Sequence, residues 1–180
     1  IFIPGAHNLE NALAAVTMTF IMGIDPKIIR DTLIKFKGVE HRIEYVDSIN
    51  GVKFYNDSKG TNPDASVKAI QSMKGPTVVI AGGMDKGTHF DSFIDAFGGV
   101  VTHMIVLGET ADKLIQTAKE KDFNSICKVD TLEQAVKEAF RLAVPGGNVL
   151  LSPACASWDM FKDYEERGRL FKEAVFALRR

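Results

Sequence analysis

The sequence predicts an α/β fold: a Rossmann-like, doubly wound domain with a mostly parallel sheet that opens with a β-hairpin. From residue 77 onwards, short runs rich in Val and Ile alternate with longer amphipathic segments. That alternation is typical of buried parallel strands connected by helices. Before it, the pair Asn50–Gly51 separates two short alternating segments, and Asn-Gly is the strongest short-range signal for a hairpin turn.

Two helices are expected ahead of the hairpin. The first covers residues 6–22 and ends at Gly23, and the second begins with Asp25 as cap and Pro26 in the first turn and runs to about residue 36. In the first helix the apolar residues recur every three or four positions: Leu9, Leu13, Val16 and Phe20. Neither helix has a strand beside it in sequence. We therefore expect residues 1–38 to be the tail of a preceding domain, residues 39–180 to be the α/β domain, and the chain to start inside a larger protein.

The remaining elements follow from the same patterns. The hairpin strands are expected at 43–47 and 52–56, with a loop at 48–51. The parallel strands are expected at 77–81, 103–107, 125–129 and 148–152, and the helices at 64–73, 91–97, 110–121, 131–143 and 159–178. Thr131 and Gln134 fit a capping box at the start of one helix.

Composition excludes several classes of protein. The 180 residues include 22 Lys and Arg against 23 Asp and Glu, a net charge of -1, so no polybasic surface for nucleic acid or membrane is expected. The longest mostly apolar stretch, residues 13–24, is too short to span a bilayer, and no signal peptide opens the chain. Cys127 and Cys155 form no metal-binding pair, so we expect reduced thiols, no metal site in this chain and a cytoplasmic location.

Four loops follow predicted strands, where an open parallel sheet binds its ligands. The polar loop 56–64 suits an anion or a nucleotide, although composition alone favours a solvated turn with Asp64 as helix cap. Loop 81–88 combines Gly82, Gly83 and Lys86, and a binding loop or a plain turn explains it equally well. In loop 152–159, Ser157 either donates to a carboxylate beside a helix start or caps that helix.

Other polar residues remain ambiguous from sequence alone. Loop 106–110 is given no function, with Thr110 as a helix cap, and Cys155 is expected to be a small buried thiol. Asn8 and Asn11 on the first helix either hydrogen-bond a heterocycle or serve as capping and surface residues. Arg42, at the domain junction, either reaches a phosphate or is a linker charge.

Taken together, these segments resemble the Mur ligases of peptidoglycan synthesis, in particular the members that add D-glutamate. The resemblance rests on motifs that occur in order along the whole chain: Gly5–Asn11, His41–Arg42, Asn56–Asn62, Gly82–Lys86, Leu151–Phe161 and Arg167–Gly168. It implies an ATP-dependent ligase of cell-wall biogenesis. Such an enzyme joins D-glutamate to UDP-N-acetylmuramoyl-L-alanine through an acyl phosphate, with Mg²⁺ as the second cofactor.

The resemblance also implies a division of the chain and roles for its residues. Residues 1–38 would end the central ATP-binding domain, while the phosphate loop and the magnesium ligands would lie upstream, so the 180 residues alone are expected to be inactive and monomeric. Asn8 and Asn11 would contact the adenine side of ATP, and Arg42 would reach the phosphates. Asp57 would hold the ribose, with Lys59 nearby on the nucleotide. The D-glutamate pocket would be lined by Thr61, Lys86, Ser157, Trp158 and Tyr164, with Lys86 and Arg42 as the catalytic cations.

Two positions depart from the family pattern. Where this chain has Trp158 the family more often has Leu or Phe, and where it has Tyr164 the family more often has Phe. Two alternative functions stay open. One is another amide-forming ligase of the same fold, of the folylpolyglutamate synthase type, and the other is a non-catalytic nucleotide-binding module.

Overall fold

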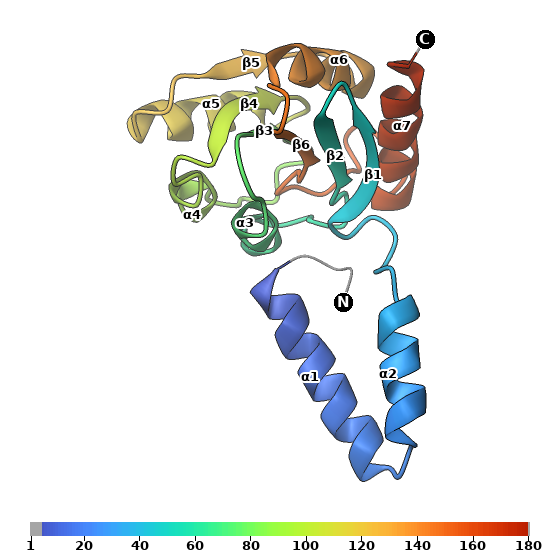
Figure 1. The fold of residues 1–180 in the computed structure, drawn as a ribbon. Helices are drawn as coiled ribbons and strands as arrows, with labels where there is room; N and C mark the ends of the chain where they lie inside the picture. Colours follow the sequence, from blue (N-terminus) through green and yellow to red (C-terminus); the bar gives the residue numbers. More distant parts are fainter. Residues whose placement is uncertain (1–4, 180) are drawn as a thin grey trace.

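A six-stranded sheet carries the fold, with strand order β1-β2-β6-β3-β4-β5 (Figure 1). The computed structural model describes residues 5–179, apart from the side chains of Ala6 and His7. The first two strands, β1 (Glu44–Ile49) and β2 (Val52–Asn56), form an antiparallel hairpin. The other strands all run parallel to β2: β6 (Asn148–Leu151), β3 (Thr77–Ala81), β4 (Val101–Val106) and β5 (Ile126–Lys128).

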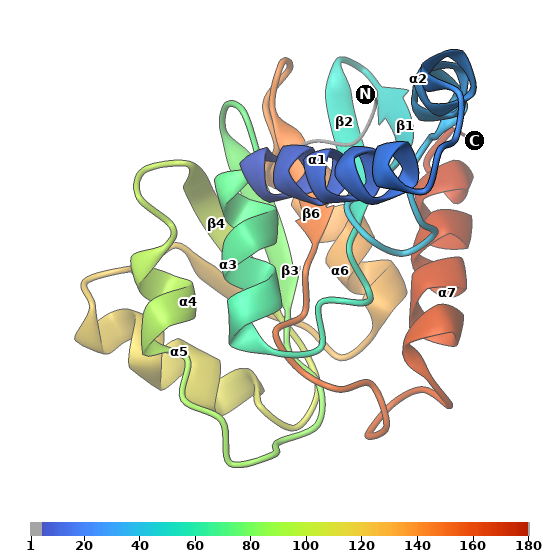
Figure 2. The same cartoon turned by 90° about the horizontal axis from the view of Figure 1, so that it is seen from below.

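Helices cover both faces of the sheet, which confirms the predicted doubly wound α/β class. One face carries α3 (Pro63–Gln71), α4 (Asp91–Asp95) and α5 (Ala111–Glu120), and the other carries α6 (Leu132–Leu142) and α7 (Tyr164–Ala177). Figure 2 views the face covered by α3, with α6 behind the sheet. Side chains alternate between the faces, so Val79 packs toward α3 while Val78 and Ile80 pack toward α6.

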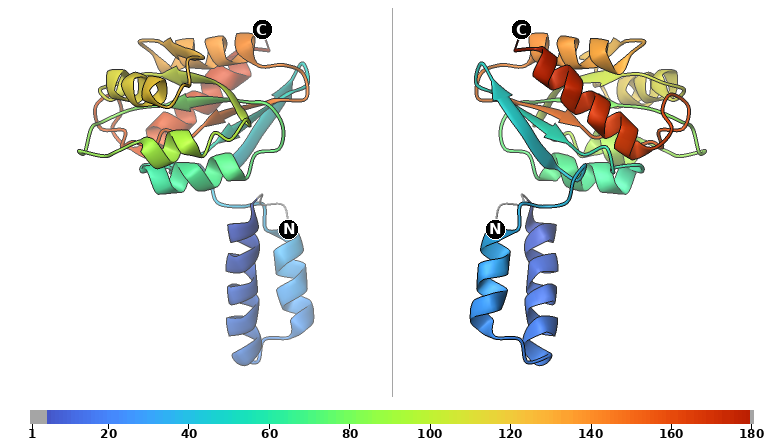
Figure 3. Two further views of the ribbon diagram at one scale, coloured as in Figure 1. Left: turned by 90° about the vertical axis from the view of Figure 1, so that its left-hand side faces the viewer. Right: turned by 90° about the vertical axis from the view of Figure 1, so that its right-hand side faces the viewer.

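The helices α1 (Ala6–Ile21) and α2 (Pro26–Lys35) form a pair that projects away from the sheet (Figure 3). Their predicted ends are confirmed: Gly23 has a φ of 81°, and the Asp25 carboxylate accepts a hydrogen bond from Lys27 N at 2.7 Å. Large apolar side chains of this pair are exposed, including Leu9, Leu13, Met18, Phe20, Ile21, Ile28 and Ile34. The assignment of residues 1–38 to a separate domain stays a prediction.

The hairpin turn is shorter than predicted. The first strand continues to Ile49, which pairs with Val52 and is buried. Asn50 and Gly51 alone form the turn, with φ of 50° and 79°. Positive φ at both central residues is the conformation that suits the right-handed twist of a two-residue hairpin, and the burial of Ile49 explains why no four-residue loop forms.

The last helix starts five residues later than predicted. The carbonyl of Ser157 accepts hydrogen bonds from Met160 N at 3.2 Å and Phe161 N at 2.8 Å, which make an isolated turn. The cap of α7 is Asp163, whose carboxylate accepts from Glu166 N at 2.7 Å. The prediction that Ser157 caps this helix, or that the helix amides lie beside it, is therefore wrong.

Other boundaries lie within two residues of the predicted ones, and one further cap was misassigned. Asn62, not Asp64, caps α3, accepting from Ala65 N at 2.9 Å. At α6 the predicted cap is confirmed, because Thr131 accepts from Gln134 N at 3.2 Å. Among the described residues, no helix has the length and apolar character needed to cross a bilayer.

Two neighbouring residues on α7 test this packing. Phe171 is fully buried against the sheet, whereas Leu170 is 41% exposed. We expect Phe171→Ala to lower the free energy of unfolding by about 3–5 kcal/mol. Leu170→Ala, the matched control, should cost about 1 kcal/mol or less. Urea unfolding followed by circular dichroism measures both, and equal losses would contradict the observed orientation of α7.

Candidate functional site

A buried polar junction lies where β2 ends. Asn56, Asp57 and Ser58 follow one another there and are all 4% exposed or less. The Asp57 carboxylate accepts from Ile43 N at 3.2 Å and from Ser152 Oγ at 2.8 Å. Burial raises the pKa of Asp57 to about 7, since a carboxylate loses its hydration there. The junction thus ties the loop after β2 to the loop after β6.

Two serines extend this junction. Ser152 Oγ lies 2.8 Å from Ser66 Oγ, which accepts from Ala154 N at 3.0 Å. The chain passes close beside them at Gly60, where an added Cβ would lie 2.5 Å from Asp57 Oδ2. Sequence reasoning assigned no role to either serine, because a buried Ser at a strand end or in a helix gives no distinctive pattern.

Arg167 joins the same two loops from α7. Its guanidinium is 2% exposed and donates to Ser58 Oγ at 3.0 Å, to the Ser58 carbonyl at 2.8 Å and to the Cys155 carbonyl at 3.2 Å. Burial lowers the pKa of Arg167 to about 10. The Arg-Gly pair was noted in the sequence, but its link to the strand loops depends on tertiary contacts.

Cys155 is a packed thiol, as predicted. It is 4% exposed, and burial raises its pKa to about 11, so the nucleophilic thiolate is disfavoured. Its sulfur lies 3.2 Å from Thr110 Oγ1.

The two glycines after β3 allow neighbouring loops to approach one another. Gly82 and Gly83 have φ of 114° and 144°, and an added Cβ at Gly83 would lie 2.2 Å from the Ala156 carbonyl oxygen. Met84 N donates to that same carbonyl at 3.0 Å. Gly83 therefore permits the close approach of the loops after β3 and β6. Gly82 permits a close approach to the loop after β4, because a Cβ there would lie 2.0 Å from the Leu107 carbonyl oxygen.

The loop after β4 also belongs to this edge, although the sequence suggested no function for it. Thr110 holds the N-cap position of α5, as predicted, but its side chain makes no capping bond there. Instead, its Oγ1 accepts a hydrogen bond from Gly83 N at 3.1 Å. Glu109 N donates to the Asp159 carboxylate at 3.0 Å. Four loops at the carboxyl edge of the sheet are thus interlocked, and at least one hydrogen bond joins each neighbouring pair.

Contacts divide the predicted D-glutamate residues into two groups. In the first, the Lys86 ammonium lies 4.3 Å from the centroid of the Trp158 ring, which is 63% exposed, and Ser157 precedes that ring in the chain. In the second, the Tyr164 ring centroid lies 5.6 Å from the Nζ of Lys59, a residue predicted to lie on the nucleotide. Thr61 is half-buried two residues after Lys59.

The second group borders a groove of about 370 Å³. It is lined by Val39, Glu40, His41, Lys59, Tyr164, Glu165 and Arg169. Arg42 is exposed and lines a neighbouring groove of about 810 Å³ together with Lys37 and Lys53. On α1, Asn8 is 9% exposed while Asn11 is exposed. The side chain of His7 lies outside the described residues.

Only one group of potential metal ligands occurs in the described part of the chain, namely Glu40, His41 and Glu44. Lys172 Nζ donates to both carboxylates, at 2.5 Å to Glu40 and 3.2 Å to Glu44. These carboxylates are thus already paired with a cation, which makes them a poor fit for Mg²⁺. The expectation that the magnesium ligands lie upstream of this chain stays a prediction.

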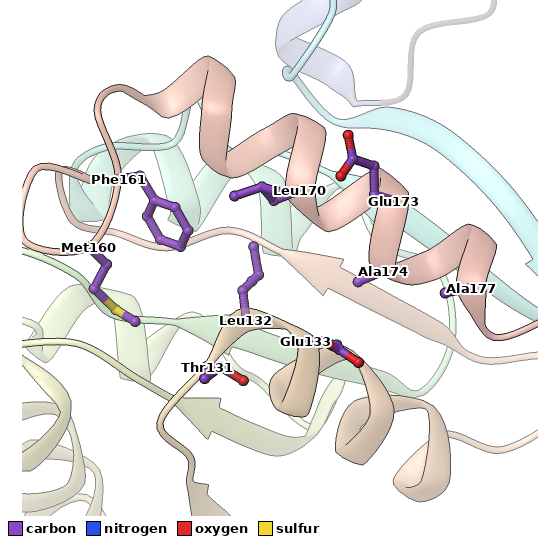
Figure 4. A pocket seen from close by; sticks show the side chains of 9 residues that line it. All are labelled: Thr131, Leu132, Glu133, Met160, Phe161, Leu170, Glu173, Ala174 and Ala177. Atoms are coloured by element: carbon purple, nitrogen blue, oxygen red, sulfur yellow. The ribbon is translucent and has the colours of Figure 1, made fainter.

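A third groove, of about 460 Å³, lies between α6 and α7 (Figure 4). Its lining is mostly apolar and consists of Thr131, Leu132, Glu133, Met160, Phe161, Leu170, Glu173, Ala174 and Ala177. None of these is a predicted site residue. The interlocked loops, not this groove, form the candidate site.

The sheet order and the helices on both faces define an α/β domain of the doubly wound class. A family model described as "Mur ligase, glutamate ligase domain" matches residues 41–155, and the chain belongs to this Mur ligase family. It is 60% identical over 182 residues to the UDP-N-acetylmuramoylalanine–D-glutamate ligase of Thermoanaerobacter sp. (strain X514), covering 100% of this chain and 40% of that protein. The ligase of the same name from Clostridioides difficile (strain 630) is 49% identical over 173 residues, 96% of this chain and 38% of that protein.

Two solved structures share the fold. The ligase MurC from Thermotoga maritima, a UDP-N-acetylmuramate-alanine ligase, superposes with a TM-score of 0.69 at 20% identity, over 98% of this chain and 39% of that one. The Mycobacterium tuberculosis folylpolyglutamate synthase complexed with ADP superposes with a TM-score of 0.70 at 16% identity, over 96% of this chain and 41% of that one. The chain spans about two fifths of the length of the proteins it matches.

The buried Asp57 predicts a pH dependence of stability. Its pKa is about 7 when folded against 3.8 as the ordinary value, so between these pH values the folded state holds a proton that the unfolded state has released. Stability from this group is therefore present below pH 4 and is lost as the pH rises toward 7. We expect the free energy of unfolding of the parent, relative to Asp57→Asn, to fall over that window. Urea titrations at several pH values measure this difference, and a constant or rising difference would refute the buried, protonated carboxyl.

Proposed function

We propose that this chain supplies the acceptor half of an ATP-dependent ligase that adds D-glutamate to UDP-N-acetylmuramoyl-L-alanine in peptidoglycan synthesis. The observation that carries the proposal is the Lys86–Trp158 contact beside Ser157, on interlocked loops at the carboxyl edge of the sheet. The high identity to D-glutamate ligases over the whole chain supports the choice of acceptor.

The reaction needs an activated carboxylate, because a carboxylate is a poor electrophile. ATP transfers its γ-phosphoryl group to the L-alanine carboxylate of the nucleotide precursor and leaves as ADP. The amine of D-glutamate then attacks the acyl carbon, an amide bond forms, the amine loses its proton, and inorganic phosphate departs. Most of the catalysis in such phosphoryl chemistry is positioning and charge stabilisation.

In this proposal the acceptor amino acid binds between the two groups of contacts. D-Glutamate carries two carboxylates, and each needs donors. The Lys86 ammonium, held over the Trp158 ring, pairs with one carboxylate, and Ser157 donates its hydroxyl to it. Thr61 and Tyr164 line the other side. Lys86 also balances negative charge that builds up as the amine attacks.

The nucleotide side of the site involves the junction between the helix pair and the sheet. Arg42 reaches the ATP phosphates with Lys59 nearby, and Asn8 and Asn11 meet the adenine from α1. Asp57 contacts the ribose in this proposal. Each of its oxygens already accepts one hydrogen bond, and a carboxylate oxygen has capacity for a second. Mg²⁺, when bound, neutralises phosphate charge, and its ligands come from residues outside this chain.

The proposal also covers the domain division, the location and the oligomeric state of the enzyme. Residues 1–38 end a central ATP-binding domain, residues 39–180 form the C-terminal domain, and the enzyme works as a cytoplasmic monomer.

A pair of lysines that flank β3 tests the acceptor site. In the full-length protein that carries this sequence, we expect Lys86→Ala to raise the KM for D-glutamate roughly tenfold or more, since a hydrogen bond to a charged group is worth about 1.5–3 kcal/mol. The KM for ATP should change little. Lys74→Ala is the matched control, because Lys74 is also exposed but precedes β3 at the opposite edge of the sheet. An unchanged KM and kcat for D-glutamate in Lys86→Ala would remove Lys86 from the site.

The 180-residue chain alone provides a second test. It contains no Gly-Lys dipeptide and therefore no P-loop of the usual kind. We expect no D-glutamate-dependent release of phosphate from ATP by this chain, measured with a coupled phosphate assay. Detectable release that depends on D-glutamate would contradict the division of labour proposed here.

A further inference from the structure

The segment that carries Arg42 has an unusual backbone. His41 and Ile43 both have positive φ, 63° and 46°. For residues other than glycine, and above all for a β-branched one, this conformation is strained and persists only where the surroundings fix it. Arg42 lies between them and is exposed, whereas both neighbours are buried. The strained positions therefore set the direction in which Arg42 leaves the fold.

Hydrogen bonds fix the backbone of residues 41–43. All three of its N–H groups and the carbonyl of His41 have partners. His41 N donates to Glu44 Oε2 at 3.0 Å, and His41 O accepts from Lys59 N at 3.0 Å. Arg42 N donates to Val39 O at 3.2 Å, and Ile43 N donates to Asp57 Oδ1 at 3.2 Å.

Asn56 fixes the imidazole of His41. Its side chain is completely buried, and its Nδ2 lies 3.0 Å from His41 Nδ1 and 3.1 Å from Glu44 Oε2. Its Oδ1 accepts from Ser58 N at 3.1 Å, so the amide nitrogen must face the imidazole. His41 Nδ1 is therefore an acceptor and the ring proton lies on Nε2.

Helix α7 also packs against the imidazole. A Cβ added to Gly168 would lie 2.2 Å from His41 Nδ1, and the Tyr164 ring meets the imidazole edge-on at 6.2 Å between centroids. Burial lowers the pKa of His41, which favours the neutral ring that accepts from Asn56. Asn56 and α7 thus both restrict the imidazole of the residue that immediately precedes Arg42.

We propose that Asn56 is a positioning residue for Arg42: through His41 it holds the strained backbone that directs the guanidinium toward the ATP phosphates. This inference rests on the proposed phosphate contact of Arg42. Asn56 itself touches no substrate.

The test uses the full-length protein that carries this sequence and compares two buried asparagines. We expect Asn56→Ala to raise the KM for ATP roughly tenfold, the scale of a modest misplacement of a binding group, with the KM for D-glutamate unchanged. Asn148→Ala is the matched control. Asn148 is 3% exposed and donates to Lys74 O at 3.0 Å and Thr77 Oγ1 at 3.1 Å, but at the amino end of β6. The Asn148→Ala protein should be less stable than the parent, with an unchanged KM for ATP.

A double-mutant cycle separates positioning from general damage. If Asn56 acts through Arg42, Asn56→Ala raises the KM for ATP no further once Arg42 is already alanine. Asn148→Ala should leave the KM for ATP unchanged in both backgrounds. Additive effects of Asn56→Ala and Arg42→Ala on the KM for ATP would overturn the inference. If Arg42→Ala by itself leaves that KM unchanged, the proposed phosphate contact fails first, and the inference fails with it.

A second variant covers the case in which Asn56→Ala does not fold. Gly168→Ala pushes on His41 from α7 while leaving Asn56 in place, and alanine is a better helix former than glycine. We expect the same selective rise in the KM for ATP. A folded Gly168→Ala protein with a normal KM for ATP would contradict the clamp on His41.

Discussion

The structure depends most on the buried hydrogen bonds made by Asn56, Asp57 and Ser58 where β2 ends. Three parts of the chain that are far apart in sequence meet there: the segment around Arg42, the loop after β6 and the start of α7. Buried polar groups are costly unless they are paired, so these contacts strongly disfavour other arrangements of the loops. The positions of the candidate site residues follow from this junction.

The same junction relates the two sides of the proposed reaction. Arg167 bonds to Ser58 and to the Cys155 carbonyl, so it links the loop that carries Lys59 to the loop that carries Ser157. The loop after β3 brings Lys86 over the ring of Trp158, the residue that follows Ser157. Buried groups therefore set the spacing of the loops that are proposed to bind the acceptor and the nucleotide.

Much of the fold follows from local patterns in the sequence. The Asn50–Gly51 turn, the Asp25 and Thr131 caps and the alternation of buried strands and helices are all signalled by neighbouring residues. The start of the last helix is not, because the apolar residues Met160 and Phe161 continue the helical pattern while Asp163 provides the cap. Periodicity indicates which residues are buried, and it does not show where a turn interrupts them.

The candidate site could be predicted in part. The motifs predict Lys86, Trp158, Lys59 and Tyr164, and the structure places these four in two contacting pairs. The supporting residues Ser66, Ser152 and Thr110 were missed, since a hydroxyl that bridges two loops has no sequence pattern of its own. Motifs identify the groups that project from the loops, whereas the hydrogen bonds that hold those loops require the tertiary structure.

The central claim is that these loops select D-glutamate. The most direct measurement is phosphate release by the full-length protein with ATP, Mg²⁺ and UDP-N-acetylmuramoyl-L-alanine, comparing D-glutamate, L-glutamate and meso-diaminopimelate as acceptors. The account predicts release with D-glutamate alone. Release with another of these acceptors, or with none, would contradict it while leaving the fold and the family unchanged.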